Sequence, residues 1–333
     1  MEFEQNYKRY GNRPYLIMMC GLPGSGKTTY AKNNITITTA KKTYRPIVLS
    51  SDQIRKEIYG DETIQGDGNK VFTKLHKKAK EELKQGNDVV IDATYIKKKH
   101  RIHFLKELNK IPCIPVCIVM ATEYSLCILN NYSRDRKVPE EVIKRMLLNW
   151  QPPHYGEGFD KISYVFSYYN DFKLVHNKQK EKYNFDTFYK VANVFDQENS
   201  HHKLTLGEHC AKAGEKIQEL SPDNFWLLVG ALLHDNGKIF TKTRNNIKGI
   251  DDGDCHYYQH HCVGAYNAMF YLHSFEDIKS NDIAYVTNLI YYHMHPYCEW
   301  KQSEKALNRD KQLLGTKLYD DIMLLHIADL FAH

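Results

Sequence analysis

Short apolar runs alternate with longer amphipathic stretches through the first half of the chain. The runs lie at residues 14–20, 46–50, 88–92 and 113–120, and patterns with helical spacing lie near residues 69–85 and 97–109. Strands that alternate with helices predict a parallel β-sheet with helices on both faces. We therefore predict an α/β fold for this half, with functional groups at the carboxyl ends of its strands.

The second half of the chain has a helical pattern. Apolar residues recur at helical spacing within residues 206–217, 225–233, 286–290 and 322–325. We predict an all-α domain here and place the domain boundary between residues 185 and 186. The chain would then consist of two domains, residues 1–185 and residues 186–333.

The composition excludes several classes of protein. The 333 residues are 42% hydrophobic and 26% charged, which is typical of folded globular domains. The eight cysteines form no C-x-x-C pair, so we expect neither a disulfide framework nor a zinc ribbon. No apolar run is long enough to span a membrane, and the amino-terminal residues do not resemble a signal peptide. We therefore expect a cytoplasmic protein.

The charge is distributed unevenly between the two halves. Residues 1–190 contain 33 Lys and Arg against 21 Asp and Glu, a net charge of +12, whereas the remaining residues contain 13 against 19, a net charge of −6. A basic half suits a polyanionic substrate, and an acidic half suits metal ions. The asymmetry supports a different role for each domain.

The segment GLPGSGKTT follows the first apolar run and matches the P-loop pattern G-x-x-x-x-G-K-[ST]. Its glycines let backbone N–H groups face a phosphate, and the Thr28 hydroxyl would ligate Mg²⁺. Lys27 would be catalytic, because it would reach the β- and γ-phosphates. We expect ATP or another NTP with Mg²⁺ as cofactor. The predicted nucleotide-binding residues of this loop are Gly21, Gly24, Ser25, Gly26, Lys27, Thr28 and Thr29.

Two carboxylates and two arginines follow at positions that suit phosphoryl transfer. Asp52 comes after the second apolar run and Asp92 closes the third, so both should lie beside the P-loop. Asp52 could be the general base for an acceptor hydroxyl or a helix cap, and Asp92 could lie near the metal or at a solvated strand end. Arg134 and Arg136 could fold over the transferring phosphate or form a solvated basic loop.

In their order, the segments GLPGSGKTT, LSSDQIR, VVIDAT and NYSRDRKVPEEVIKRM resemble the P-loop 5′-OH polynucleotide kinases over roughly residues 14–165. The resemblance implies that Asp52 is the general base and that Arg55 grips a phosphate next to the acceptor hydroxyl. Arg134 matches the catalytic lid arginine of the family, and Arg136 is the second candidate for that position. Both arginines would contact the nucleotide.

One position departs from the family. Asp92 is followed by Ala93, Thr94 and Tyr95, whereas the family often has a Thr-Asn pair there, so the role of Asp92 stays open. Small-molecule kinases share the P-loop architecture. The assignment of a polynucleotide acceptor therefore depends mainly on Asp52 with Arg55.

Polar groups with metal-binding chemistry continue the apolar stripes of the second half. These groups are His209, His234, Asp235, His293 and Asp329. A lone buried histidine usually needs only one hydrogen bond, but several such groups on separate helices of one domain indicate a shared metal ion. His260, in the segment QHHCVGA, adds a further imidazole.

The segments TLGEHC, ALLHDNGK, QHHCVGA, IYYHMHP and IADLFAH resemble the HD-domain metal phosphohydrolases over about residues 200–333. The resemblance implies a first metal held by His209, His234, Asp235 and Asp329, and a second held by Asp235, His260 and His293. One or two ions remain open, and Mn²⁺ or another transition metal is expected. Lys238 and Thr241 are candidates for contacts to the substrate phosphate. Asp235 would be the central catalytic group.

A kinase and a phosphohydrolase in one chain could act on the two ends of a broken polynucleotide, the kinase on the 5′-OH end and the hydrolase on the 3′ end. The arrangement resembles the bifunctional end-healing enzymes, which phosphorylate a 5′-OH end and remove a 3′-phosphate or 2′,3′-cyclic phosphate from RNA or DNA. A separate ligase would be the partner. Two alternatives stay open: a small-molecule or nucleotide kinase fused to an HD nucleotide phosphohydrolase, and an HD hydrolase controlled by an NTP-driven switch.

Overall fold

The computed structural model describes residues 5–9, 11–64, 66–108, 110–167, 181–199 and 203–333. The chain divides into two compact units, one of residues 1–144 and 157–167 and the other of residues 145–156 and 168–333. The predicted domain boundary between residues 185 and 186 stays a prediction, and residues 168–180 lie outside the described residues.

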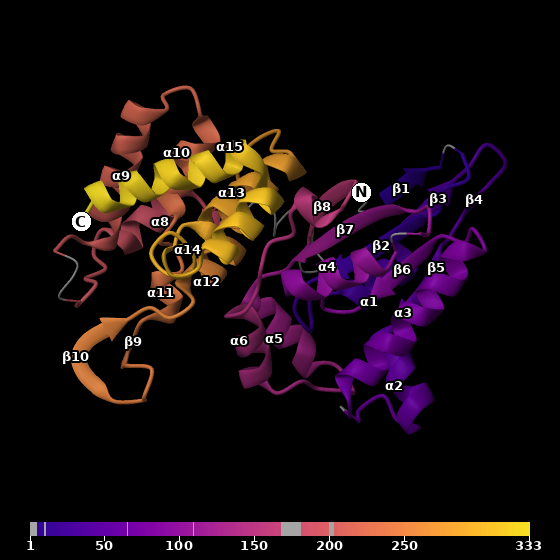
Figure 1. Ribbon diagram of the computed structural model, residues 1–333. Helices are drawn as coiled ribbons and strands as arrows, with labels where there is room; N and C mark the ends of the chain where they lie inside the picture. The colour runs from indigo at the N-terminus through magenta and orange to yellow at the C-terminus, as the bar shows by residue number, and fades with distance from the viewer. Residues whose placement is uncertain (1–4, 10, 65, 109, 168–180, 200–202) are drawn as a thin grey trace. The chain divides into compact units, whose positions relative to one another are not determined.

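The first unit contains a five-stranded parallel sheet with the strand order β5-β6-β2-β7-β8 (Figure 1). The strands are β2 (Tyr15–Cys20), β5 (Ile47–Ser50), β6 (Val89–Asp92), β7 (Ile114–Ala121) and β8 (Lys161–Phe166). The first four coincide with the predicted apolar runs, and the sequence analysis did not predict β8. Leu16 to Cys20 are all buried, and because successive side chains point to opposite faces, both faces of the sheet are covered.

Helices connect these strands. Their bounds are α1 (Lys27–Asn33), α2 (Ser51–Tyr59), α3 (Gly68–Lys84), α4 (Lys98–Glu107), α5 (Tyr124–Tyr132), α6 (Glu140–Leu147) and the 3₁₀ turn η1 (Tyr155–Glu157). On one face of the sheet, Ile17 and Met19 of β2 share a core with Tyr30 and Ala31 of α1. The parallel sheet with connecting helices confirms the predicted α/β class.

A small second sheet completes the first unit. It consists of β1 (Gln5–Lys8), β3 (Ile35–Thr38) and β4 (Thr43–Tyr44), in which β1 pairs in parallel with β3, and β4 pairs antiparallel to β3. Tyr7, Ile35 and Ile37 pack into the same core as Ile17. The alternating burial of the ITIT segment explains this strand, which the sequence analysis did not predict.

The second unit is mainly helical, as predicted. Its helices are α8 (Phe185–Ala192), α9 (Leu206–Leu220), α10 (Phe225–Leu233), α11 (Lys238–Thr241), α12 (His260–Leu272), α13 (Ser280–Tyr292), α14 (Glu299–Gln302) and α15 (Glu304–Phe331), the last with a break at Gly315. Helices α9, α10, α12, α13 and α15 pack around the shared core of this unit. In the described parts of the chain, no helix has both the length and the apolar character needed to cross a bilayer.

A β-hairpin is the exception to the predicted all-α fold. Strands β9 (Thr243–Asn245) and β10 (Asp251–His256) pair antiparallel. Oδ1 of Asn246 accepts hydrogen bonds from the N–H groups of Lys248 at 2.9 Å and Ile250 at 3.2 Å, and Gly249 has a φ of +80°. These side-chain bonds and the left-handed glycine stabilise a turn instead of a continued helix.

Arg101 and Glu157 form a fully buried ion pair in the first unit. Nε and Nη2 of Arg101 each lie 2.7 Å from a carboxylate oxygen of Glu157, and both side chains are 0% exposed. Nη1 of Arg101 donates to the carbonyl of Tyr95 at 2.9 Å, and the same carbonyl accepts a hydrogen bond from the thiol of Cys20. The ion pair therefore supports the end of β2, from which the P-loop starts.

We expect Arg101→Met to lower the free energy of unfolding by about 3–5 kcal/mol, because Glu157 would keep a buried charge without its partner. Urea-induced unfolding of the full chain measures this effect. The control is Lys77→Met, since Lys77 is 75% exposed and its Nζ lies 4.0 Å from Glu81. The control should cost less than about 1 kcal/mol. Equal effects of the two variants would contradict the structural importance of the buried pair.

Candidate phosphoryl-transfer and metal sites

The P-loop lies between β2 and α1, as the sequence predicted. Nζ of Lys27 donates to the carbonyl oxygens of Gly21 at 3.0 Å and Leu22 at 2.7 Å, and to Oγ of Ser25 at 3.3 Å. Gly26 adopts a left-handed conformation with a φ of 85° directly before α1. The loop thus wraps around its own lysine ammonium group. Burial lowers the pKa of Lys27, and the negative charge of Asp92 opposes this shift.

Thr28 and Asp92 meet at the carboxyl end of the sheet. Oγ1 of Thr28 donates to Oδ2 of Asp92 at 2.7 Å, and Asp92 is buried as the last residue of β6. A hydroxyl and a carboxylate next to a P-loop form an oxygen-rich donor set, which suits Mg²⁺. This contact gives Asp92 a position beside the predicted Mg²⁺ ligand and makes a solvated strand end a poor description of it.

Residues that the sequence analysis missed hold the carbonyl groups of the P-loop. Oγ1 of Thr122 and Oγ of Ser167 donate to the carbonyl of Ser25 at 3.0 and 3.3 Å, and Nδ2 of Asn130 donates to the carbonyl of Gly24 at 2.9 Å. At Gly24, which has a φ of +78°, a Cβ atom would lie 2.1 Å from the carbonyl of Cys127. Only glycine fits at this position, and the loop conformation is fixed from three sides.

Asp52 begins the next part of the site, in the first turn of α2. Its carboxylate does not cap the helix, because Ser50 is the N-cap residue and accepts the hydrogen bond from the Asp52 N–H. Nη1 of Arg55 lies 2.8 Å from Oδ1 of Asp52, and Nη1 of Arg136 forms an ion pair with the same oxygen. The structure thus brings together the predicted base, the predicted acceptor-binding arginine and one of the two loop arginines.

Arg134 lies two residues before Arg136, between α5 and α6. Its positive charge is one of the groups that lower the pKa of Lys27, after burial as the largest cause. Arg134 is therefore close enough to the P-loop lysine to act on it, whereas Arg136 pairs with Asp52. The assignment of both arginines to the nucleotide stays a prediction. Thr29 lies in α1, and Ser25 lies in the loop before this helix, as the P-loop motif predicts.

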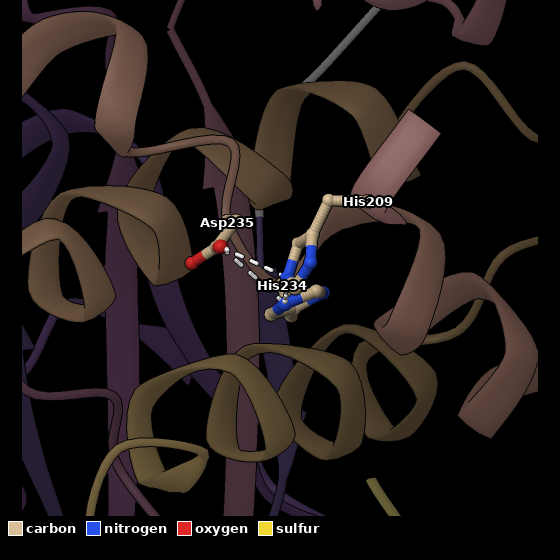
Figure 2. Close-up of side chains that lie close together, drawn as sticks. All are labelled: His209, His234 and Asp235. Atoms are coloured by element: carbon tan, nitrogen blue, oxygen red, sulfur yellow. Dashed lines mark hydrogen bonds and ion pairs between the residues drawn. The ribbon is translucent and has the colours of Figure 1, made fainter. Parts of the chain in front are cut away.

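In the second unit, the predicted metal ligands come together as one buried cluster. Nε2 of His209 lies 3.1 Å from Nε2 of His234, 3.4 Å from Oδ2 of Asp235 and 3.0 Å from Oδ1 of Asp329. Figure 2 shows His209, His234 and Asp235 converging from α9 and from the end of α10. All four side chains are at most 7% exposed. Three of these groups offer ligand atoms close enough for one ion.

The second predicted set shares Asp235 with the first. Oδ1 of Asp235 lies 3.2 Å from Nε2 of His260 and 3.5 Å from Nε2 of His293, and these two nitrogens are 3.1 Å apart. Each oxygen of Asp235 therefore faces a different pair of histidines. Asp235 thus belongs to both groups of ligand atoms that are close enough together to hold an ion.

Backbone carbonyls orient the rings of the four histidines. Nδ1 of each ring faces a backbone carbonyl, those of Ala332, Ala231, Tyr257 and Ile290, at 2.6 to 3.3 Å. A carbonyl only accepts, so Nδ1 donates to it, and Nε2 is the atom left to bind a proton or a metal ion. The Nε2 atoms of each histidine pair lie 3.1 Å apart, so a proton or a metal ion between them is needed to offset the repulsion of the two lone pairs. Metal-binding histidines have this arrangement of carbonyls.

Charges around Asp235 reinforce the same conclusion. Burial opposes ionisation of Asp235, but Lys238 and the histidines hold the pKa of its carboxyl well below the usual value. Burial also opposes a charge on His209, yet Asp235 and Asp329 raise the pKa of His209 to about 9. The cluster is thus arranged to hold positive charge between its carboxylates.

The two predicted phosphate-binding residues have different surroundings. Nζ of Lys238 is buried and lies 2.7 Å from Oδ2 of Asp235 and 2.8 Å from Oε1 of Gln197. Oγ1 of Thr241 donates to the carbonyl of Gly237 at 3.0 Å within the same helical segment. Lys238 therefore contacts the histidine–aspartate cluster directly, while the Thr241 hydroxyl can still accept a hydrogen bond from a ligand. Their roles toward a substrate stay predictions.

Tyr297 is a further part of the cluster that the sequence analysis missed. Its hydroxyl donates to Oδ2 of Asp329 at 2.9 Å, so Oδ1 of Asp329 is the oxygen that faces His209 and His234. His333 also approaches this oxygen, at 3.7 Å. A tyrosine in the short turn between α13 and α14 gives no pattern in sequence that points to this contact.

A second group of possible ligands, His295, Glu299 and Asp310, needs no metal for charge balance. Nε and Nη2 of Arg309 each lie 3.0 Å from a carboxylate oxygen of Asp310. Nη2 of Arg309 also lies 3.7 Å from Glu299. The guanidinium group of Arg309 therefore supplies the positive charge that a metal would otherwise provide.

Comparisons with known proteins concern the first unit. The family model described as an AAA domain matches residues 16–153. L-seryl-tRNA(Sec) kinase of Methanococcus maripaludis is 29% identical over 144 residues, which are 41% of this chain and 53% of that protein. The chain thus spans about half the length of this curated relative. These matches confirm a P-loop domain of the kinase type, and the family match ends before the histidine cluster.

Two solved structures resemble the chain distantly. A protein from Chloroflexus aurantiacus described as a candidate kinase gives a TM-score of 0.37 at 16% identity and covers 49% of this chain and 90% of its own. A chain of the Pnkp1/Rnl/Hen1 RNA repair complex gives a TM-score of 0.34 at 16% identity and covers 41% of this chain and 44% of its own.

Proposed function

We propose that the chain is a bifunctional enzyme that heals broken ends of RNA or DNA. The first unit would phosphorylate 5′-OH ends with ATP or another NTP. The second would remove a 3′-phosphate or a 2′,3′-cyclic phosphate. One observation carries the proposal: the chain combines a P-loop, with the Asp52–Arg55 pair that suits a phosphate-bearing hydroxyl acceptor, and a separate buried cluster of four histidines and two aspartates.

The residues of the kinase site would divide the work of phosphoryl transfer. Lys27 and the backbone N–H groups of the P-loop would bind the β- and γ-phosphates, and Thr28 with Asp92 would hold Mg²⁺, which neutralises phosphate charge. Asp52 would accept the proton of the acceptor hydroxyl. Oδ1 of Asp52 is paired with two arginines, so Oδ2 is the oxygen left for this proton. Arg134, near Lys27, would stabilise the charge that develops during transfer.

In the second unit, the four histidines and Asp235 and Asp329 would hold one or two transition-metal ions. Imidazole ligands suit transition-metal ions better than Mg²⁺. A bound ion would supply Lewis-acid chemistry and activate water near neutral pH. The role of the chain itself is to orient the ligands, through the four carbonyls at Nδ1 and through Tyr297. Lys238 would neutralise a substrate phosphate near Asp235.

The two activities have a common substrate in a cleaved polynucleotide. Many cleavage reactions leave a 5′-OH end and a 2′,3′-cyclic phosphate end. A ligase usually needs a 5′-phosphate and a 3′-OH. The net charge of +12 on residues 1–190, from 33 basic and 21 acidic residues, suits a polyanion. The curated relative, named for its action on L-seryl-tRNA, is a kinase with an RNA-linked substrate. A separate ligase would complete the repair.

The test is an assay of the full chain with ATP, Mg²⁺ and Mn²⁺ on an oligonucleotide that carries a 5′-OH and a 3′-phosphate. Transfer of the γ-phosphate to the 5′ end together with release of the 3′-phosphate is the expected result. Transfer to a free nucleoside but not to the oligonucleotide would favour a small-molecule kinase. NTP hydrolysis without transfer would favour an NTP-driven switch that controls the second unit.

We expect Arg55→Ala to raise the KM for a phosphate-bearing acceptor and to leave the KM for ATP almost unchanged. A charge-assisted contact between Arg55 and a phosphate contributes about 1.5–3 kcal/mol, and its loss corresponds to a rise of about 10- to 100-fold. The measurement is steady-state kinetics with each substrate varied in turn. Lys56→Ala, next to Arg55 in α2 and exposed, is the control. An unchanged acceptor KM in Arg55→Ala would remove this role.

A further inference from the structure

The small sheet of the first unit has one apolar face and one polar face. On the apolar face, Tyr7, Ile35 and Ile37 pack into the core. Successive residues of a strand point to opposite faces, and residues paired across strands point to the same face. The polar face therefore carries the residues that alternate with these three, and one residue of β4: Asn6, Lys8, Thr36, Thr38 and Thr43. All five are exposed or half-buried, so this face is accessible to a ligand.

Hydrogen bonds connect the three strands across the polar face. Oγ1 of Thr38 donates to Oδ1 of Asn6 at 2.8 Å and lies 2.8 Å from Oγ1 of Thr43. The hydroxyl of Thr38 has a single hydrogen, so Thr43 is the donor in the second contact. The amide N–H groups of Asn6 and the ammonium group of Lys8 are the donors that this row offers to a ligand.

The charges around the polar face have one sign. Residues 5–51 contain eight Lys and Arg and no Asp or Glu, and Glu2 and Glu4 lie outside the described residues. Five of these cations are exposed, on β1, in the last turn of α1, in the turn between β3 and β4, and after β4: Lys8, Lys32, Lys41, Lys42 and Arg45. None of the five has an ion pair in the part of the chain that the structure describes. A solvated surface normally mixes both signs, so cations alone indicate an anionic partner.

Carboxylates on the neighbouring strands have arginines of their own. The side chain of Asp88, before β6, is 0% exposed, and its Oδ2 lies 3.0 Å from Nη1 of Arg9. Burial is the main cause that raises the pKa of Cys113, and Arg13 and Asp160 act on this pKa in opposite directions, so both lie near the same thiol. We therefore leave Arg9 and Arg13 out of the group of available cations.

The polar face lies away from the phosphoryl-transfer site. Helix α1 begins at the P-loop and ends at Asn33 beside the start of β3, and β5 begins after β4 and ends directly before Asp52. The small sheet is thus at the amino ends of the parallel strands, whereas the P-loop and α2 follow their carboxyl ends (Figure 1). The six residues of β2 span about 20 Å, roughly the length of six stacked nucleotides.

We propose that the polar face and the five exposed cations around it bind the phosphodiester backbone of the strand whose 5′ end is phosphorylated. Lys, Arg, Thr and Asn side chains contact phosphate oxygens in nucleic-acid complexes, and such contacts do not read the base sequence. This inference rests on the proposed function and extends it. The preferred acceptors are RNA or DNA strands long enough to reach from the P-loop to the small sheet, whatever their sequence.

The experiment compares 5′-OH acceptors of about 4 and about 20 nucleotides, with the full chain, ATP and Mg²⁺ at several salt concentrations. In the wild type, the long acceptor should have the lower KM and the steeper salt dependence. Lys8→Ala/Lys41→Ala should raise the KM of the long acceptor about 10- to 30-fold at low salt, because each lost phosphate contact lowers the slope of log K against log salt by about 0.7. The KM values for the short acceptor and for ATP should change less than about twofold.

The control is Lys77→Ala/Lys106→Ala, which removes two exposed positive charges from α3 and α4 and leaves the net charge the same as in the test variant. It should keep the KM of the long acceptor. Equal effects of the two double variants would overturn the inference, because the long acceptor would then respond only to the net charge of the protein.

Direct binding separates this inference from the kinase function. Fluorescence anisotropy of the labelled long strand, without ATP, should show weaker binding to Lys8→Ala/Lys41→Ala than to the wild type. If the wild type phosphorylates both acceptors with the same KM and salt dependence, the inference fails while the kinase function stands. If the strand binds through Lys8 and Lys41 but is not phosphorylated, the binding surface stands and the kinase function fails. Binding to phosphatidylserine vesicles but not to the strand would assign the surface to a membrane and overturn the inference.

Discussion

Lys27→Ala is expected to abolish 5′ phosphorylation, with kcat reduced by at least about 10²- to 10³-fold, and to leave 3′-phosphate release at the wild-type rate. Lys27 is the charge that would meet the β- and γ-phosphates, and its Nζ is held by Gly21, Leu22 and Ser25. Without the Lys27 ammonium group, no buried cation of the P-loop would offset the negative charge that develops on the phosphates during transfer. The measurement is transfer of radiolabelled γ-phosphate to a 5′-OH oligonucleotide.

Lys32→Ala is the matched control for this prediction, because Lys32 lies on the same helix and is exposed. It should keep both activities. Circular dichroism of Lys27→Ala should match the wild type, since Lys27 makes no ion pair in the described part of the chain. A parallel loss of 3′-phosphate release in Lys27→Ala would show that the second unit depends on nucleotide binding and would favour the NTP-driven switch.

Asp235→Ala is expected to remove bound transition metal and 3′-phosphate release, while 5′ phosphorylation continues. Asp235 is the group that faces both pairs of histidines, so neither ligand set is complete without it. We expect a loss of activity of at least about 10²-fold, because outer ligands alone usually account for 10- to 100-fold. Metal content, measured by elemental analysis after dialysis against Mn²⁺, is a readout that does not depend on activity.

The alanine variant also leaves Lys238 buried without its carboxylate partner, so a second variant is needed. Asp235→Asn keeps the shape and removes the charge, and it should lose metal as well. Asp223→Asn, on an exposed turn, is the control and should bind metal normally. In the wild type, a chelator should stop 3′-phosphate release, and Mn²⁺ but not Mg²⁺ alone should restore it. Full metal content in Asp235→Asn would contradict the proposed metal centre.

Local sequence patterns predicted the parts of both sites that depend on local chemistry. The P-loop is a contiguous motif, so its strand, loop and helix follow from one short segment. The histidines of the second unit were visible for a different reason. His209, His234 and His293 continue or end apolar stripes, where a polar group needs a partner, and His209 and His293 are indeed 1% exposed.

Contacts between distant segments left no such pattern. Thr122 and Ser167 hold the P-loop from the ends of two strands, but a small hydroxyl residue after a strand is common and has no preferred partner in sequence. Arg101 follows three lysines and a histidine, so its segment looked like a solvated basic helix. Its burial depends on Glu157, 56 residues later, and sequence spacing alone gives no reason to pair them.

The course of the chain between the two units limits how the protein can be divided. The polypeptide leaves the first unit after residue 144, returns to it at residue 157 and leaves it again after residue 167. A fragment that ends at residue 144 would lack β8 and would leave Arg101 without Glu157. A fragment that ends at residue 167 would carry Trp150 away from Tyr266, against which its ring packs at 5.2 Å. No single cut therefore yields two intact halves, and point substitutions are the suitable means of separating the two proposed activities.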